Sequence, residues 1–290
     1  MRLLVIGSTG QVARALSVRG AQAGHDVIGV GRPQIDLEHP TGLGDLFASV
    51  SPDVVINAAA YTAVDKAEND AARADAINHK GAVALARSAE AMGLPFIQIS
   101  TDYVFDGLKG APYLEADTVS PVNVYGRSKA LGETGVLAAH PNALVVRTSW
   151  IYAAEGTNFV RTMLRLAADR DHLNVVNDQI GRPTEAEALA VALLSLSQSL
   201  RSGADGGLLH VANDGEASWR DFAEAAIHGA GLKAHVEGIP TSDYPTPAAR
   251  PRDTRLDLTK AQRDYDVRLP DWRDSLERCL TAMGAGGRGA

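Results

Sequence analysis

The chain has 290 residues, of which 28 are Lys or Arg and 35 are Asp or Glu, so the formal net charge is −7. This acidic balance argues against nucleic acid as the main partner, because binding to a phosphate backbone requires a basic face. Hydrophobic residues make up 45% and charged residues 22%, proportions that argue against an intrinsically disordered chain. No apolar stretch approaches the roughly 18 residues that cross a bilayer. Cys279 is the only cysteine, so no intrachain disulfide forms, and we expect a cytoplasmic protein with no membrane contact.

Short aliphatic runs alternate with helical patterns through the first 150 residues. Helices are predicted at residues 11–24 and 71–92, and strands at residues 3–6, 25–30, 53–58, 95–100 and 143–149. Strands that are aliphatic throughout, rather than alternating, are typical of a parallel sheet covered on both faces. Residues 1–150 are therefore predicted to form a doubly wound, Rossmann-like α/β domain that binds a dinucleotide.

Strand and helix patterns alternate less regularly in the second half of the chain. Helices are predicted at residues 158–169 and 185–200, strands at 173–176 and 208–212, and loops at 177–184 and 239–255. Ser218 stands in position to cap another helix, with Asp221 at its third residue. The tail at residues 284–290 is mainly glycine and alanine and is expected to bury little surface. We predict that residues 151–290 form mainly a smaller α/β substrate-binding lobe, with some segments returning to the first domain.

A glycine-containing turn, GSTGQVA at residues 7–13, separates the first predicted strand from the first predicted helix. Gly7 permits a tight turn, Gly10 allows a diphosphate to approach the backbone, and Ala13 allows close packing of helix on strand. The amide groups at the start of the helix then face the anion. Any tight strand-to-helix turn can use such glycines, but this position in a βαβ pattern predicts dinucleotide binding.

The end of the second predicted strand reads Val30-Gly31-Arg32 and lacks the carboxylate that usually holds the ribose 2′-hydroxyl of NAD. Arg32 is placed to face a 2′-phosphate instead, which favours NADPH over NADH. The alternative is a solvated arginine in a turn. Asp36 follows shortly afterwards, either beside the adenine or as the cap of the next helix.

Tyr125 and Lys129 are spaced to lie one turn apart on the same face of a helix. A cation near a tyrosine is expected to lower the pKa of the phenol, which suits a group that exchanges a proton. The bare pattern is common by chance. Thr101, however, stands at the carboxyl end of a predicted parallel strand, where ligands bind in such sheets, and can complete a Thr, Tyr, Lys set.

These motifs resemble the extended short-chain dehydrogenase/reductases, and within them the chain is similar to the dTDP-4-dehydrorhamnose reductase family. The resemblance covers nearly the whole chain, and the later segments separate this family from related epimerases and dehydratases. It is carried by residues 7–12, 57–68, 100–105, 125–129, 147–152, 177–184 and 244–251.

The resemblance implies hydride transfer from NADPH, or NADH, to C4 of dTDP-4-dehydro-β-L-rhamnose. It implies that Tyr125 is the proton donor, that Lys129 holds the nicotinamide ribose, and that Thr101 binds the sugar carbonyl oxygen. The remaining implied cofactor contacts are Gly10, Gln11 and Val12 at the diphosphate, Asp36 and Leu37 at the adenine, and Ala60, Tyr61 and Thr62 at the inner ribose and nicotinamide. The implied sugar-nucleotide contacts are Thr101, Asp102, Trp150 and Val64. Without the resemblance, Trp150 can equally be a core aromatic residue.

Some members of the family hold magnesium at a dimer contact through glutamates. Here Glu187 is one candidate ligand, but Ala15 stands where another would be, and residues 279–283 contain no acid. A single carboxylate is insufficient for a hard cation, which needs several oxygen ligands. The eight histidines show no metal-ligand spacing. We therefore expect no metal site, and a monomer or weak homodimer.

Two alternative functions stay open from the sequence. One is another sugar-nucleotide reductase or an epimerase of the same superfamily; the other is a non-catalytic, NADP-binding regulatory subunit. The presence of both Tyr125 and Lys129 favours catalysis. Four loop arginines, each either binding the substrate diphosphate or serving the structure, are unassigned: Arg182, Arg250, Arg252 and Arg255.

Overall fold

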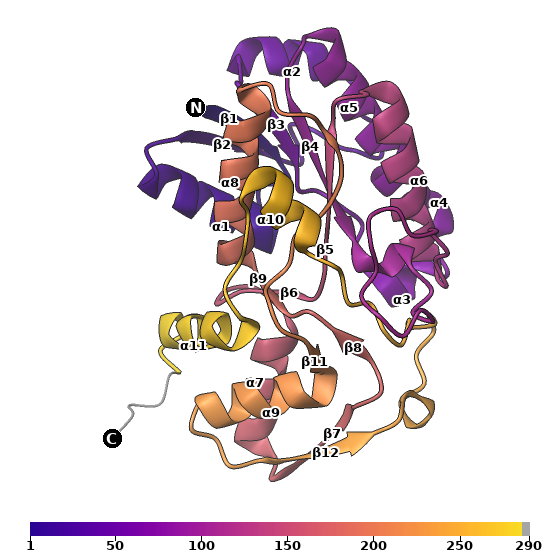
Figure 1. The fold of residues 1–290 in the computed structure, drawn as a ribbon, viewed down its shortest axis with the longest axis vertical. Coiled ribbons are helices and arrows are strands. Elements are labelled where there is room, and N and C mark those ends of the chain that lie inside the picture. Colours follow the sequence, from indigo (N-terminus) through magenta and orange to yellow (C-terminus); the bar gives the residue numbers. More distant parts are fainter. Residues whose placement is uncertain (286–290) are drawn as a thin grey trace.

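A six-stranded parallel sheet organises the larger part of the molecule (Figure 1). The computed structural model describes residues 1–285, so most of the tail at residues 284–290 lies outside the described residues. The strand order is β10-β5-β4-β3-β1-β2. The strands are β1 (Arg2–Ile6), β2 (Asp26–Val30), β3 (Val54–Asn57), β4 (Phe96–Thr101), β5 (Leu144–Thr148) and β10 (Gly207–His210). The chain turns to opposite sides of β1 to form β2 and β3, so ligands are expected at the carboxyl ends of these strands.

Helices cover both faces of this sheet, which confirms the predicted doubly wound α/β fold. Leu3 and Val5 of β1 face one layer of helices, and Leu4 and Ile6 face the other. This alternation follows from the strand geometry, and burial on both faces explains why the strands are aliphatic throughout. The first layer contains α1 (Gln11–Gln22), α8 (Ala186–Arg201) and α10 (Thr259–Tyr265); the second contains α2 (Leu43–Val50), α5 (Ala82–Ala91) and α6 (Val124–Ala139).

A smaller lobe lies beyond the carboxyl edge of the sheet, in the lower half of Figure 1. Its core contains Phe222 and Trp272, both buried. Its elements are α7 (Phe159–Asp169), α9 (Trp219–Gly229), α11 (Trp272–Ala282), the parallel pair β7 (His172–Val176) and β12 (His235–Ile239), and the two-residue strands β6 (Ile151–Tyr152), β8 (Ile180–Gly181), β9 (Thr184–Glu185) and β11 (Ala217–Ser218). Both α8 and β10 come from the second half of the chain but belong to the sheet layers. No helix within residues 1–285 is long and apolar enough to cross a membrane.

The single helix predicted over residues 71–92 is interrupted. Helix α4 (Ala71–Asp75) continues into a π-helical segment, η1 (Ala76–Gly81), before α5 begins. A Cβ atom at Gly81 would lie 2.5 Å from the backbone oxygen of Leu37, so this turn passes very close to a neighbouring loop. The alanine-rich pattern predicts helicity but not the extra residue per turn, and π-helical turns are frequent at functional sites.

Other differences from the prediction involve pairing with distant segments. The predicted loop at 177–184 contains β8 and the start of β9, and the sequence pattern misses β12 because its partner β7 is 63 positions away. The sequence patterns also missed five helices: α3 (Val64–Ala67), η2 (Asp102–Val104), η3 (Thr241–Asp243), α10 and α11. The predicted cap is confirmed, since the Ser218 hydroxyl accepts from the Asp221 amide at 3.1 Å and the Asp221 carboxylate accepts from the Ser218 amide at 3.2 Å.

Candidate active site

A cavity of about 460 Å³ lies at the carboxyl ends of β1, β3, β4 and β5. Ten of the predicted site residues line it: Gly10, Gln11, Val12, Ala60, Thr62, Thr101, Asp102, Tyr125, Lys129 and Trp150. Six lie outside its wall: Gly7, Arg32, Asp36, Leu37, Tyr61 and Val64. The fold therefore brings the glycine turn, the Thr101 strand end and the Tyr125 helix to one cavity.

The glycine turn has the geometry of an anion cradle. Gly7 has a φ of +106°, and a Cβ atom there would lie 2.9 Å from the backbone nitrogen of Ala59, so only glycine fits. Its amide donates to the carbonyl of Val30 at 2.8 Å, which ties the turn to the end of β2. Gly10 precedes α1 with no side-chain cap on the first amides. This open helix start fits the diphosphate of a dinucleotide.

The residues predicted at the adenine end differ in exposure. Arg32 is exposed just beyond β2, and the residues on either side of it, Gly31 and Pro33, carry no carboxylate. The carboxylate of Asp36 accepts from the amide of Glu38 at 3.0 Å in a local turn. The cap residue of the next helix, α2, is Gly42, so the interpretation of Asp36 as its cap is wrong. Leu37 is buried in the core beneath α5.

Tyr61 points away from the cavity, although its neighbours Ala60 and Thr62 line it. Its phenol donates to the carboxylate of Asp70 at 3.2 Å. Its backbone is held by Asn78 of the π-helical segment, whose side chain accepts from the Tyr61 amide at 2.8 Å and donates to the Tyr61 carbonyl at 3.0 Å. The Tyr61 side chain thus lies outside the cavity wall, and its predicted contact with the cofactor stays a prediction.

The first turn of α6 positions Tyr125. Asn123 caps the helix by accepting from the amide of Gly126 at 2.8 Å, and Glu68 accepts from the amide of Val124 at 2.8 Å. A Cβ atom at Gly126 would lie 2.2 Å from the carbonyl oxygen of Tyr103, so glycine lets the helix approach β4's end closely. Tyr125 and Lys129 consequently reach the cavity from the same helix face, as their spacing predicts.

The electrostatics of this pair differ from the expectation. Burial raises the pKa of Tyr125 to about 12, opposed by a hydrogen bond from Thr101. The Lys129 ammonium donates to the carbonyl of Ile99 at 2.7 Å, so burial and not this cation sets the direction in which the pKa of Tyr125 moves. Burial also lowers the pKa of Lys129 to about 8. At neutral pH the phenol is thus protonated, the form required of a proton donor.

Asp102 and Trp150 form the part of the wall nearest the small lobe. Burial raises the pKa of Asp102 to about 7, and its Oδ2 atom has no hydrogen-bond partner within the described chain. Trp150 has a φ of +46°, an uncommon conformation for a bulky residue, and its ring lies against Gly181, where a Cβ atom would be 2.5 Å away. Trp150 also packs on the small lobe's core. It is therefore both a packing residue and part of the cavity wall.

The four unassigned arginines all have partners in the protein. Arg182 donates to the carbonyls of Leu256 at 2.7 Å and Gly215 at 2.6 Å. The others pair with carboxylates: Arg250 with Asp65 at 2.9 Å, Arg252 with Asp178 at 3.3 Å, and Arg255 with Asp253 at 2.7 Å and Glu216 at 2.8 Å. None of the four lines the cavity. The structure thus gives these arginines structural contacts.

Sequence reasoning missed part of the cavity wall. Thr148 lines it and its buried hydroxyl has no hydrogen-bond partner among residues 1–285. Other wall residues lie inside the motif segments but were given no role: Thr9, Ala58, Ala59, Ser100, Ser149 and Ile151. Ile99, Gly156 and Thr157 complete the wall from outside those segments. Only Glu133, which is buried behind the wall, carried a usable signal, because it continues the four-residue spacing of Tyr125 and Lys129.

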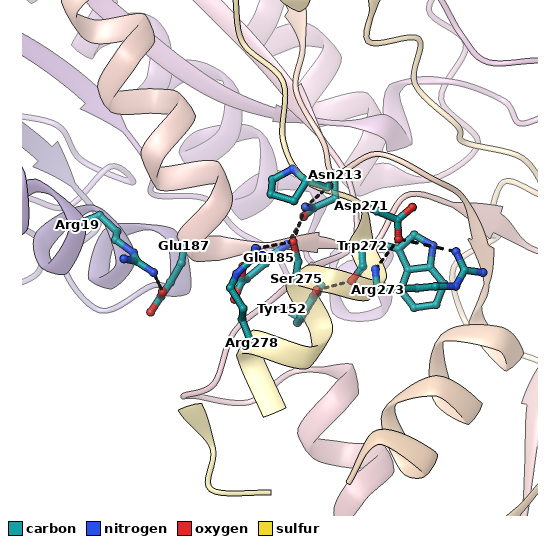
Figure 2. Close-up of polar contacts among 11 residues, drawn as sticks. Arg19, Tyr152, Glu185, Glu187, Asn213, Asp271, Trp272, Arg273, Ser275 and Arg278 are labelled. Atoms are coloured by element: carbon teal, nitrogen blue, oxygen red, sulfur yellow. Dashed lines mark hydrogen bonds and ion pairs between the residues drawn. The ribbon is translucent and has the colours of Figure 1, made fainter. Parts of the chain in front are cut away.

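The residues present do not fit a magnesium site at the family's dimer contact. Glu187 pairs with Arg19, and Glu185 pairs with Arg278 at 3.0 Å (Figure 2). Ala15 offers no ligand, and residues 279–283 contain no acid. Both carboxylates are thus already neutralised by arginines.

One group of three metal-ligating side chains does assemble within residues 1–285. His172, His235 and Glu237 have ligand atoms within 4.8 Å of one another on β7 and β12. The spacing of histidines along the chain misses this group because the two strands are far apart in sequence. All three are exposed, and the group lies outside the cavity wall.

The doubly wound sheet, the glycine cradle and the Tyr125–Lys129 helix face together define an oxidoreductase of the short-chain dehydrogenase/reductase type. The sequence matches the RmlD substrate binding domain family over residues 1–285. It is 43% identical, over 292 residues and 98% of each chain, to a dTDP-4-dehydrorhamnose reductase of Sinorhizobium fredii. The chain belongs to the dTDP-4-dehydrorhamnose reductase family, whose members are NAD(P)H-dependent oxidoreductases.

Two solved structures are similar over nearly their whole length. A dTDP-4-dehydrorhamnose reductase from Clostridium acetobutylicum superposes with a TM-score of 0.92 at 35% identity, covering 98% of this chain and 100% of that one. The Bacillus anthracis dTDP-4-dehydrorhamnose reductase, solved in complex with NADP, gives a TM-score of 0.91 at 33% identity and covers 97% of this chain and 98% of that one.

Proposed function

We propose that this chain reduces the C4 ketone of dTDP-4-dehydro-β-L-rhamnose to an alcohol, giving dTDP-L-rhamnose, the last step of dTDP-L-rhamnose synthesis. When bound, the reduced nicotinamide supplies the hydride. The protein must then hold the ketone beside the nicotinamide, supply one proton and stabilise the oxygen on which charge develops. The observation that carries this proposal is the placement of Thr101, Tyr125 and Lys129 in one cavity with the glycine cradle.

Thr101 and Tyr125 are assigned to the ketone oxygen. The Tyr125 phenol, protonated at neutral pH, donates its proton to the alkoxide oxygen as C4 is reduced. Thr101 donates a second hydrogen bond to the same oxygen and fixes its direction. Lys129, anchored on the Ile99 carbonyl at 2.7 Å, holds the nicotinamide ribose. The free Oδ2 atom of Asp102 accepts from a sugar hydroxyl, and the Trp150 ring packs against the sugar nucleotide.

The cofactor assignment is NADPH in preference to NADH. The support is the exposed Arg32 at the end of β2, together with the missing carboxylate there. The similarity to the NADP complex from Bacillus anthracis supports the same choice. A planar guanidinium can bind a 2′-phosphate with two parallel hydrogen bonds, whereas NADH offers only a hydroxyl.

Tyr125→Phe tests the proposed function. Turnover of dTDP-4-dehydro-β-L-rhamnose, generated in place by the preceding pathway enzymes, is followed by the loss of NADPH absorbance and by identification of the product. The variant should lose at least about 99% of kcat, the scale of a general-acid contribution, while NADPH binding is retained. Tyr265→Phe, which removes a hydroxyl outside the cavity, is the matched control. Near-normal turnover by the Tyr125 variant would refute the assignment.

A failure of the parent enzyme has a separate meaning. If it binds NADPH but reduces no 4-keto sugar nucleotide, the regulatory-subunit interpretation replaces catalysis. If it instead reduces or epimerises a different sugar nucleotide, the reaction type survives and the proposed substrate does not.

A further inference from the structure

A buried ion pair lies directly behind the cavity wall. Glu133 and Arg147 are 4% and 1% exposed, and they meet through two hydrogen bonds of 2.9 and 2.7 Å. The Ser100 hydroxyl donates a further bond of 2.5 Å to Glu133. A buried ion pair of this kind gives little net stability, because removing both charges from water costs about as much as their attraction returns. Stability alone therefore does not explain why the Glu133–Arg147 pair lies beside the reacting groups.

The positions of these residues connect the ion pair to Lys129. Glu133 lies one helical turn after Lys129 on the same face of α6, and side chains on a helix lean toward its N-terminus, so the carboxylate leans toward the lysine's turn. Arg147 is the register partner of Ser100 on the adjacent strand. The Lys129 ammonium binds the Ile99 carbonyl, one residue before Ser100. Helix α6 is thus hydrogen-bonded to two consecutive residues near the end of β4, Ile99 through Lys129 and Ser100 through Glu133.

We propose that Glu133, anchored by Arg147 and Ser100, is a positioning residue that keeps Lys129 protonated and aimed at the nicotinamide ribose. This inference rests on the proposed function, in which Lys129 is the ribose-binding cation. Its physical basis is that Lys129 is 4% exposed, and a buried ammonium loses its charge unless an anion compensates it. A carboxylate fixed by two partners can supply that compensation without moving into the cavity.

The other charges around Lys129 do not supply this compensation. Tyr125 faces it from the same helix and stays neutral, since burial raises its pKa to about 12. Asp102 lies across the cavity at the end of β4, and burial raises its pKa to about 7, so it is only part-ionised at neutral pH. Behind the pair, His210 touches Arg147 at 3.3 Å and is neutral, because burial lowers its pKa to about 3. Burial lowers the pKa of Lys129 and Glu133 raises it, which leaves the value near 8.

Glu133→Gln tests the inference through the pH dependence of the reaction. In the parent, kcat should fall as the pH rises through about 8, the pKa of Lys129. Without the carboxylate that pKa is lower still, so the alkaline limb of the profile should move down by on the order of one pH unit. Glu185→Gln is the matched control, since Glu185 is also 4% exposed and paired with an arginine but lies outside the cavity wall (Figure 2). Its profile should match the parent's.

A second variant covers the case in which Glu133→Gln fails to fold around an unpaired Arg147. The double variant Glu133→Gln with Arg147→Met removes both charges at similar volume, which buried pairs often tolerate. It should also move the alkaline limb down, by less than Glu133→Gln does, because the opposing Arg147 charge is removed with the carboxylate. A folded double variant with the parent's alkaline limb would overturn the inference.

The lysine can also be observed without turnover. The titration of the Lys129 side chain, followed by NMR of its Cε-labelled carbon in the protein without substrate, should move down in both Glu133 variants, further in the single one. An unchanged titration overturns the role of Glu133 whatever the substrate proves to be. A shifted titration in a protein that reduces no 4-keto sugar nucleotide would contradict the proposed function alone.

Discussion

Trp150 and Trp219 stack face to face, with ring centroids 3.5 Å apart and planes within 5° of each other. Trp150 follows β5 and lines the cavity, whereas Trp219 opens α9 in the small lobe and donates through its indole N–H to Gln179 at 3.2 Å. The stack therefore joins the cavity wall to the lobe. The position of the lobe and the shape of the substrate end of the cavity are coupled through this stack.

Trp219→Ala should weaken substrate binding more than cofactor binding. Without its partner, Trp150 loses the surface that orients its ring, so KM for the sugar nucleotide should rise about tenfold while Kd for NADPH changes little. The free energy of unfolding should fall by about 2 kcal/mol, less than for a fully buried tryptophan. Steady-state kinetics and urea denaturation measure the two effects. Trp219→Phe keeps an aromatic face, so its KM and its free energy of unfolding should lie between those of the parent and of Trp219→Ala. Equal losses of substrate binding and cofactor binding in Trp219→Ala would contradict the coupling.

Arg32→Ala should discriminate between the two nicotinamide cofactors. Loss of a charge-assisted bond to a 2′-phosphate costs about 1.5–3 kcal/mol, so Kd for NADPH should rise roughly 10- to 100-fold. Kd for NADH should change less than about threefold by the same reasoning. Fluorescence titration of both cofactors gives the values. Arg87→Ala, at another exposed arginine on α5, controls for a general change in charge. Equal weakening of both cofactors would remove Arg32 as a phosphate ligand.

Asp102→Asn should change how stability depends on pH. Burial raises the pKa of Asp102 from 3.8 to about 7, so the folded state holds a proton that the unfolded state has lost between those values. The parent's free energy of unfolding therefore loses the contribution of this group as the pH rises. Asparagine has no such proton. As the pH rises from 5 to 8, the free energy of unfolding of the variant should increase relative to that of the parent by on the order of 2 kcal/mol.

Denaturation at several pH values measures this difference. Asp178→Asn is the control: although burial acts to raise it, hydrogen bonds from Thr241 and Arg252 hold the pKa of Asp178 below 3.8. The Asp178 variant should differ from the parent by a constant amount across the same window. A constant difference for Asp102→Asn as well would show that this carboxyl titrates normally.

Magnesium should have no effect on the apoprotein. Because Glu187 pairs with Arg19 and Glu185 with Arg278, added Mg²⁺ has to displace an arginine from each of these carboxylates. Thermal unfolding and sedimentation should be the same with Mg²⁺ and with EDTA. A shift to a dimer on addition of Mg²⁺ would show that these ion pairs open.

The large sheet could be predicted from the sequence because its strands are aliphatic on both faces and its helices have regular spacing. The small lobe could be predicted only in outline. Its short strands pair with segments far along the chain, as β8 does with β11 and β12 with β7, and local patterns contain no information about such pairing. The π-helical turn around Asn78 was equally invisible, because it depends on the close passage of the loop at Leu37.

In the candidate site, too, features that depend on local sequence patterns could be predicted, and features that depend on contacts between distant segments could not. The glycine turn and the Tyr125–Lys129 spacing are local patterns, and both line the predicted cavity. The pKa of Tyr125 could not be predicted, because it depends on where the Lys129 ammonium points and on how much water reaches the phenol. The ion pair of Glu133 with Arg147 likewise needs the register of β4 against β5.

The order in which the sheet is completed has a consequence for making the protein in pieces. β5 has its outer edge covered by β10, and the apolar face over β1 and β3 is closed by α8 as well as α1, yet β10 and α8 both follow residue 150. A fragment ending there would present an unpaired strand and an uncovered hydrophobic layer, the features that lead chains to aggregate. The nascent chain passes through the same state on the ribosome, because the sheet of the N-terminal domain stays incomplete until α8 and β10 have been synthesised.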